Sequence, residues 1–241
     1  MKALPLFTLL IALSGYACAA DTSWKEVKTL SLKSEFNTTS DWHVTAWQPN
    51  GKNSETGNIA AKLCFWDSLA NQQKNCTSIT SMLPNDGMMY YYQTFNGLEL
   101  IHPDATSPPL LKFSASFSGG GSGSLGQISF WKYDRQINRF EPSSHITLTE
   151  QGEYHLFNKG DLAGMLTTAN AVWQAGETHF SSHHFYIEVY RFDSNNGYVK
   201  QLGYLTPSSY PSFDEAEKID VISHEIPRIE KLLVTIKSQK P

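Results

Sequence analysis

The sequence predicts a mostly β protein: an antiparallel sandwich or a partial-propeller-like arrangement of repeated hairpins, followed by a C-terminal amphipathic α-helix. Aromatic residues make up 12% of the chain and charged residues 17%, which is below the quarter that is usual in globular domains. The longest run of β-branched and aromatic residues covers residues 185–205. It breaks once, at DSNNG (residues 193–197), a sequence that favours a tight turn. Two weaker copies of this hairpin lie upstream, and a stripe of isoleucines follows it.

The individual strands are expected where apolar and polar residues alternate between turn-forming segments. They cover residues 27–32, 42–47, 59–67, 76–79, 88–95, 98–101, 110–117, 127–134, 146–149, 154–157, 185–192 and 198–205. A further return strand begins at Arg139, and Asn96-Gly97 is a hairpin signal between two of the strands. Residues 161–170 fit either one or two turns of helix or a loop with a short strand.

Three hairpin units align on Asp67, Asp134 and Asp193, which lie 67 and then 59 residues apart. An aromatic residue precedes each aspartate, and the spacing is about the length of a four-stranded β module. This self-similarity indicates an internal repeat, as in propeller blades or stacked β units. Any aromatic strand that ends in Asp before a turn would give the same pattern, because Asp favours turn starts. Three units are too few for an ordinary closed propeller, so a sandwich of repeated hairpins fits equally well.

The first 20 residues have the form of a secretory signal peptide, with Lys2, an apolar run over residues 3–13 and small residues up to Ala20. The apolar run is too short to cross a bilayer, which takes about 20 residues. Lipid attachment at Cys18 is disfavoured, because Gly15 stands where a large aliphatic residue is needed. We therefore expect an exported protein, periplasmic or extracellular, without a transmembrane segment.

The rest of the chain is expected to form a β-rich domain over residues 21–206 and a linker with a helical segment over residues 207–241. Its two cysteines, Cys64 and Cys76, predict a disulfide, because an even count in an exported protein favours pairing. Two buried free thiols are the alternative. The formal net charge is −4 and no basic run is longer than two residues, so the sequence gives no electrostatic basis for nucleic-acid binding.

The C-terminal segment changes its hydrophobic period from two to between three and four residues. Ser212-Phe213-Asp214-Glu215 predicts a capping box for a short helix. An amphipathic helix is then expected to start near Ser223, so that Pro227 falls in its first turn. Its apolar face, expected to pack on the sheet, consists of Ile222, Ile226, Ile229, Leu233 and Ile236.

One histidine-rich segment could hold a metal ion. Glu177, His179, His183 and His184 bring three imidazoles and a carboxylate within eight residues, and neutral imidazole is a common ligand for zinc and copper. In an extended chain His179 and His183 point to one side and His184 to the other, so a loop is needed to bring all three together. A polar loop or hairpin edge without metal is the alternative, and we expect no cofactor.

Two other motifs resemble catalytic or nucleotide-binding patterns without their required context. The sequence GSGSLG (residues 121–126) matches the phosphate-cradling pattern, but the residues that follow predict a strand, whereas that mechanism needs a helix N-terminus. His224-Glu225 begins like a zinc-protease motif, but Arg228 stands where the second histidine is needed.

Aromatic side chains are the remaining candidates for a binding surface, because a flat ring gives a large contact area at a small entropic cost. The candidate binding residues are Trp42, Trp47, Tyr91, Trp131, Tyr186 and Tyr190. The alternative for each ring is that it fills the core. In the last hairpin we expect Phe185, Ile187 and Val189 to face the core, and Tyr186 and Tyr190 to face a second layer or solvent.

These observations predict an exported, non-catalytic binding protein of unknown specificity, with a protein or glycan partner in the cell envelope. One alternative is a metal- or carboxylate-dependent hydrolase that uses the loop with His179, His183 and His184. The other alternative is a structural protein of the envelope.

Overall fold

The computed structural model describes residues 24–50, 59–68, 75–80, 92–118, 124–148, 152–178, 180–211 and 219–239. Its elements are β1 (Trp24–Ser31), α1 (Lys33–Phe36), β2 (Trp42–Pro49), β3 (Ile59–Asp67), β4 (Asn75–Thr80), β5 (Tyr92–Ile101), β6 (Leu110–Ser118), β7 (Ser124–Asp134), β8 (Arg139–Leu148), β9 (Glu153–Phe157), β10 (Met165–Val172), β11 (His184–Asp193), β12 (Gly197–Leu205) and α2 (Val221–Gln239). The protein is therefore mostly β with one long C-terminal helix, as the sequence predicts.

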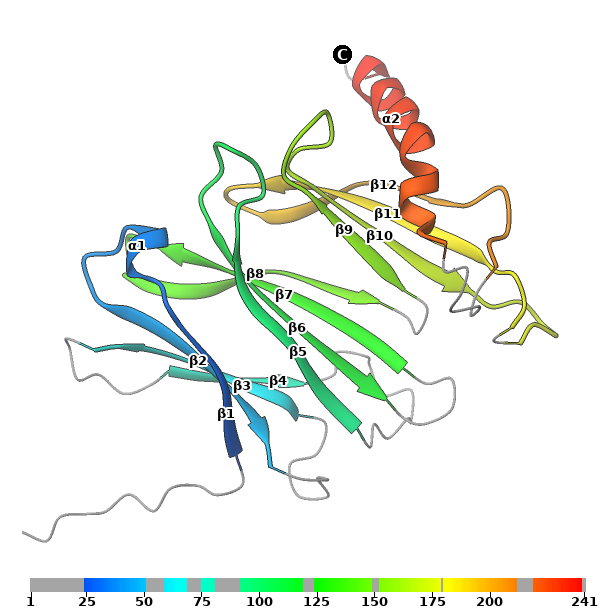
Figure 1. The fold of residues 1–241 in the computed structure, drawn as a ribbon. Helices are drawn as coiled ribbons and strands as arrows, with labels where there is room; N and C mark the ends of the chain where they lie inside the picture. The colour runs from blue at the N-terminus through cyan, green and yellow to red at the C-terminus, as the bar shows by residue number, and fades with distance from the viewer. Residues whose placement is uncertain are drawn as a thin grey trace, which may run out of the picture.

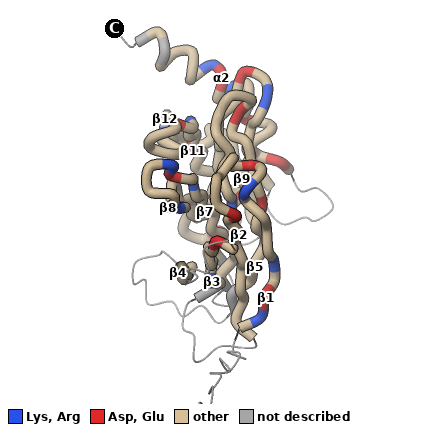
Figure 2. Tube along the Cα trace, turned by 90° about the vertical axis from the view of Figure 1, so that its left-hand side faces the viewer, with Lys and Arg blue, Asp and Glu red and all other residues tan. Residues whose placement is uncertain are grey.

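The strands form three four-stranded antiparallel sheets, and in each sheet the spatial order is the order along the chain. We call them sheet A (β1–β4), sheet B (β5–β8) and sheet C (β9–β12). Figure 1 shows them following one another like an open fan, with α2 beyond sheet C. Figure 2 shows Lys and Arg interspersed with Asp and Glu along the trace. None of the described helices is long and apolar enough to cross a membrane.

Three hydrophobic clusters hold the layers together, one at each interface. Sheets A and B bury the first, which includes Leu63 and Phe113. Sheets B and C bury the second, which includes Phe130 and Leu166. The third lies between sheet C and α2 and includes Ile187. Each interior sheet face is thus covered by the next layer.

The aligned aspartates Asp67, Asp134 and Asp193 each end the third strand of their sheet. In sheets B and C the carboxylate caps the following turn. Asp134 Oδ1 accepts a hydrogen bond from the backbone amide of Gln136, and Asp193 Oδ1 accepts one from the backbone amide of Asn195. Each of these two turns ends in a left-handed residue, Asn138 (φ 51°) and Gly197 (φ 74°).

These two turns also contact the preceding sheet. The Trp42 indole of sheet A donates to Asn138 Oδ1 at 3.0 Å. The Tyr198 amide, next to the sheet C turn, donates to Ser144 Oγ of sheet B at 2.6 Å. A Cβ on Gly197 would lie 2.2 Å from Ser144 Oγ, so the close approach of the two sheets requires glycine there.

The helix α2 packs its predicted apolar face on sheet C. Ile222 and Ile229 are fully buried and Leu233 is 8% exposed. The helix starts at Val221, two residues before the expected start, so Pro227 lies in the second turn rather than the first. Asp220 sets this start, because its carboxylate accepts the Ser223 amide at 2.9 Å. The capping box predicted at residues 212–215 lies outside the described residues, as do residues 1–23.

Several local predictions differ from the structure. Residues 92–101 form the single strand β5, in which Asn96-Gly97 is a bulge instead of a hairpin, because pairing with β6 continues on both sides of it. Residues 165–172 form the strand β10, where the sequence left open a helix or a loop with a short strand. The strand from Arg139 runs without a break to Leu148. The four-residue helix α1 was not expected from the sequence.

Cys64 and Cys76 form a disulfide between the paired strands β3 and β4, as the cysteine count predicts. The phosphate-cradling pattern is not followed by a helix, because Ser124 already begins β7.

Candidate functional site

The outer face of sheet A, on the side away from sheet B, gathers three tryptophans. Val44, Ala46, Leu63 and Phe65 point into the core between sheets A and B. Because side chains alternate along a strand, their neighbours on β2 and β3 point outward. We call this outward surface the tryptophan face; it consists of Trp24, His43, Thr45, Trp47, Lys62 and Trp66.

One end of the tryptophan face is built around Trp66. The His43 ring stacks on the Trp66 ring with centroids 4.5 Å apart. The Trp66 indole donates to Thr45 Oγ1 at 3.1 Å, and Thr29 Oγ1 donates to the same oxygen at 3.0 Å. Thr45 is only 2% exposed although it is on the outward side, so the rings close over it. These contacts fix the orientation of the Trp66 ring before any ligand arrives.

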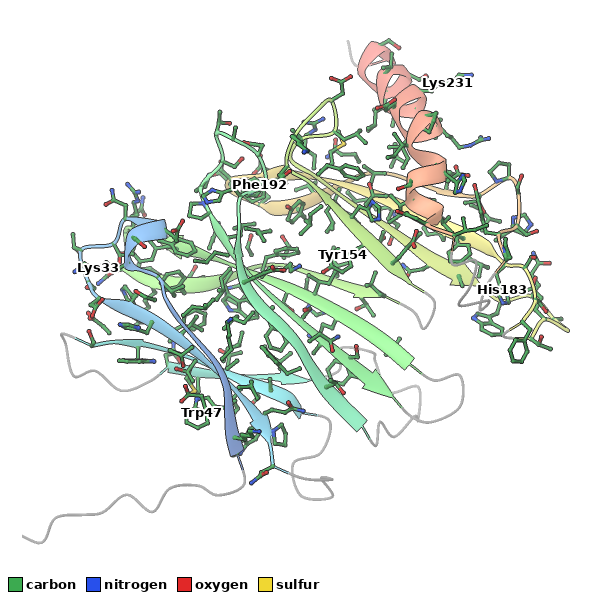
Figure 3. All side chains as sticks on the ribbon, in the orientation of Figure 1. Lys33, Trp47, Tyr154, His183, Phe192 and Lys231 are labelled. Atoms are coloured by element: carbon green, nitrogen blue, oxygen red, sulfur yellow. A yellow bond between two sulfur atoms is a disulfide. The ribbon has the colours of Figure 1, made fainter. Side chains whose placement is uncertain are left out.

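The other end of the face holds Trp24 and Trp47. Lys62 is the cross-strand partner of Trp47, and its Nζ lies 3.9 Å from the centroid of the Trp24 ring. Figure 3 shows Trp47 on sheet A, at the opposite end of the molecule from His183. Trp47 lies four residues beyond His43 on β2, so the two ends of the face are about 14 Å apart along the strand.

Charge at the edge of the face is fixed by local contacts. Asp41 accepts a short hydrogen bond from Ser68 and lies 3.4 Å from His43 Nε2. The hydrogen bond from Ser68, with that from His43, lowers the pKa of the Asp41 carboxyl, so it is ionised at neutral pH. The Cys64–Cys76 disulfide adjoins the centre of the face, because Thr45 pairs with Cys64.

Among the six aromatic residues predicted as binding candidates, the five that the structure describes do not come together. Trp42 and Trp131 are 8% and 3% exposed and lie in the core between sheets A and B. Trp47 lies on the tryptophan face, while Tyr91 is outside the described residues. Tyr186 and Tyr190 lie on sheet C, where Tyr186 is 38% exposed.

The two sheet C tyrosines belong to a network with an ion pair. Tyr190 donates to Glu188 at 3.0 Å, and Lys200 Nζ lies 2.6 Å from the same carboxylate. Burial, with the neighbouring Glu188 charge, raises the pKa of Tyr190. Phe185, Ile187 and Val189 point the other way, into the core under α2, as expected.

The structure gives the two described histidines of the histidine-rich segment, His183 and His184, different partners. His183 is fully buried; its Nδ1 lies 2.8 Å from Glu177 Oε2 and its ring packs 4.5 Å from Trp173. The His184 ring points elsewhere, with Nδ1 2.8 Å from the Thr206 carbonyl. His179 lies outside the described residues. Among the residues that the structure describes, no group of three or more His, Cys, Asp or Glu side chains could hold a metal ion.

The tryptophan face contains Trp24, Trp66, His43 and Lys62, which sequence reasoning did not select. The sequence signal that could have found them is their spacing. His43 and Trp47 are an even number of residues apart on β2, and so are Lys62 and Trp66 on β3, so each pair lies on one face of its strand. No family model, curated protein or solved structure matches this chain.

Proposed function

We propose that this protein is an exported, non-catalytic binding protein and that the tryptophan face binds a glycan. The observation that carries the proposal is the presence of Trp24, Trp47 and Trp66 on one outward sheet face. Contacts with His43 and Thr45 hold the Trp66 ring, and Lys62 lies over the Trp24 ring. Indole rings offer flat apolar surfaces to the C–H faces of sugars, and pre-oriented rings lose little entropy on binding.

The mixture of groups on the face favours a glycan over a protein partner. Protein interfaces have a contiguous apolar centre that is depleted of charge. Here the half-buried indoles alternate with Lys62 and the Asp41–His43 pair, whose polar atoms are able to hydrogen-bond with sugar hydroxyls. The large apolar side chains that are most exposed, such as Phe180 and Val234, lie on other parts of the described chain.

Export is supported by the leader-like residues 1–20 and by the disulfide, because disulfides persist in oxidising compartments. Mass spectrometry of the protein from fractionated bacterial cells would test it. We expect a periplasmic or secreted chain that begins near Asp21, and a cytoplasmic chain with an intact N-terminus would contradict the proposal.

Affinity electrophoresis tests glycan binding directly. The mature chain is run through gels that contain neutral or acidic soluble polysaccharides, and we expect at least one of them to retard it. Trp47→Ala should weaken that binding about 30-fold, because a tryptophan that anchors a ligand contributes about 2 kcal/mol. Trp173→Ala is the matched control, since Trp173 is 39% exposed but lies on the far side of the stack, after β10. Retardation by none of the polysaccharides, or equal loss in both variants, would reject the proposal.

A further inference from the structure

A cavity of about 260 Å³ opens between sheets A and B, on the inner side of sheet A. Its lining residues come from the edge strands β4 and β8 and from β7. Its lining includes Thr77, Ile79, Gln127, Ser129, Trp131 and His145. The cavity and the tryptophan face are therefore on opposite sides of sheet A.

The side chains of sheet B that border this cavity are polar where a sheet-packing surface is normally apolar. Gln127 and Ser129 are only 4% and 6% exposed. On the opposite face of the same strands, Ile128 and Ile146 pack in the core against sheet C. Polar groups buried at such a surface need hydrogen-bond partners, because one left without a partner costs about 1–3 kcal/mol.

His145 adds a third hydrogen-bonding group. Its Nδ1 lies 2.9 Å from Ser129 Oγ, and its Nε2 is buried without a partner among the described residues. Burial lowers the pKa of His145, so the imidazole is neutral at neutral pH. No Asp, Glu, Lys or Arg occurs among the described residues that line the cavity. The site therefore offers hydrogen bonds without charge.

We propose that this cavity is a second binding site, which takes a single neutral ring that carries hydroxyl groups, as a monosaccharide does. Trp131 and Ile79 supply apolar surface for the ring. Gln127 and the Ser129–His145 pair supply donors and acceptors for its hydroxyls. The volume is below the roughly 300–1,000 Å³ of sites for drug-sized ligands, so one ring fits better than an extended chain.

The alternative occupant is water alone, because buried polar groups are often satisfied by ordered water. NMR of the mature chain distinguishes the two. The ligands are D-glucose, D-galactose and N-acetyl-D-glucosamine, and the signals followed are the His145 imidazole C–H and the Gln127 side-chain amide. We expect at least one sugar to shift both signals in a saturable way, while the ring signals of His102, which is on the surface, stay in place. No saturable shift with any of the three sugars would leave water as the occupant and overturn the proposal.

The variant Gln127→Leu separates binding from folding. It replaces the amide with an apolar group of similar size, so we expect the protein to fold while the affinity for the sugar falls about tenfold. Ser116→Ala, on the opposite face of sheet B, is the control and should leave the affinity unchanged. An unchanged affinity in Gln127→Leu would contradict the proposal. Trp47→Ala should bind the sugar in this cavity normally. The proposal for the cavity and the proposal for the tryptophan face are therefore tested independently.

Discussion

The two outer faces of the three-sheet stack differ in what covers them. The outer face of sheet C carries Ile187 and Val189, both fully buried beneath α2. The outer face of sheet A carries half-buried tryptophans, and no described element packs over it. At the covered end α2 takes the place of a fourth sheet. The open end instead presents ring surfaces mixed with polar groups, a composition that solvent tolerates and a ligand can use.

The covered end is also anchored by polar contacts. The carboxylate of Glu225 is 4% exposed and accepts hydrogen bonds from Tyr204 at 2.9 Å and Tyr210 at 2.5 Å. At the start of the helix, Glu153 Oε1 accepts the Ile222 amide at 2.7 Å. These bonds connect α2 to sheet C and to the segment after β12. We therefore expect that loss of packing at the covered end affects stability most. At the open end the covalent disulfide should matter for stability, whereas the side chains of the tryptophan face should affect mainly binding.

The largest effect is expected for Ile229→Ala in α2. Ile229 is fully buried, and truncation of such a side chain costs about 2–5 kcal/mol through lost burial and the cavity left behind. Val234→Ala on the same helix is the control, because Val234 is 66% exposed and should change stability by less than about 0.5 kcal/mol. Urea unfolding measures both. Equal effects would mean that α2 does not cover sheet C in solution.

A comparable effect is expected at the open end from the disulfide. The two cysteines are 12 residues apart, and closure of a loop of that length stabilises the folded state by about 3 kcal/mol in the chain-entropy model. The double variant Cys64→Ser, Cys76→Ser should unfold at correspondingly lower urea concentration. Wild-type protein in reductant should fall to the same stability, and a variant as stable as the oxidised wild type would refute the prediction.

A smaller, pH-dependent effect is expected from Tyr210 at the covered end. Burial, then the hydrogen bond to Glu225, raises the pKa of Tyr210 to about 12. Below pH 10 the tyrosine is protonated in both the folded and unfolded states, so its contribution to stability is fully present. As the pH rises from about 10 to about 12 the unfolded state loses the proton first, and this contribution is lost.

The variant Tyr210→Phe tests this assignment. Urea unfolding at several pH values above about 9 should show a shallower fall in stability than in wild type, by about 1 kcal/mol or less because Tyr210 is partly exposed. In Tyr210→Phe the stability should still fall with rising pH, because burial and Glu225 raise the pKa of Tyr204 too. Identical pH profiles in the two proteins would show that Tyr210 titrates normally.

The same two faces show how far the sequence alone can lead. Alternation places Trp42 and Trp47 on opposite sides of β2, because they are an odd number of residues apart. It cannot say which side meets solvent, and only the packing of sheet B buries Trp42 and leaves Trp47 outside. The stripe on α2 is readable because the helix has one apolar face, and the disulfide is readable from the cysteine count.

The strand β10 could not be predicted from the sequence for a related reason. It is the third layer's inner strand and is covered on both sides, so it lacks alternation: Thr167 and Thr168 are buried as fully as Leu166. Sequence reasoning also missed Gln127 and Ser129 in the cavity, because polar residues that alternate along β7 look like an ordinary solvent-facing side. It did select Trp131, which lines the same cavity. Whether a sheet face meets water, a ligand or another sheet is a property of the stack that no single strand encodes.

The smallest effect is expected for Lys62→Met at the open end. A cation over an indole at a site near the surface contributes about 0.5–1 kcal/mol, and methionine keeps most of the apolar stem over the Trp24 ring without the charge. The free energy of unfolding should therefore fall by no more than that amount. The difference in stability between wild type and Lys62→Met should be smaller at high salt, because salt screens the charge. Lys25→Met is the control, since Lys25 is exposed and adjoins Trp24 in the chain. A loss of several kcal/mol in Lys62→Met would mean that the open face is as much a part of the folding core as the covered one, and the contrast between the two ends would have to be abandoned.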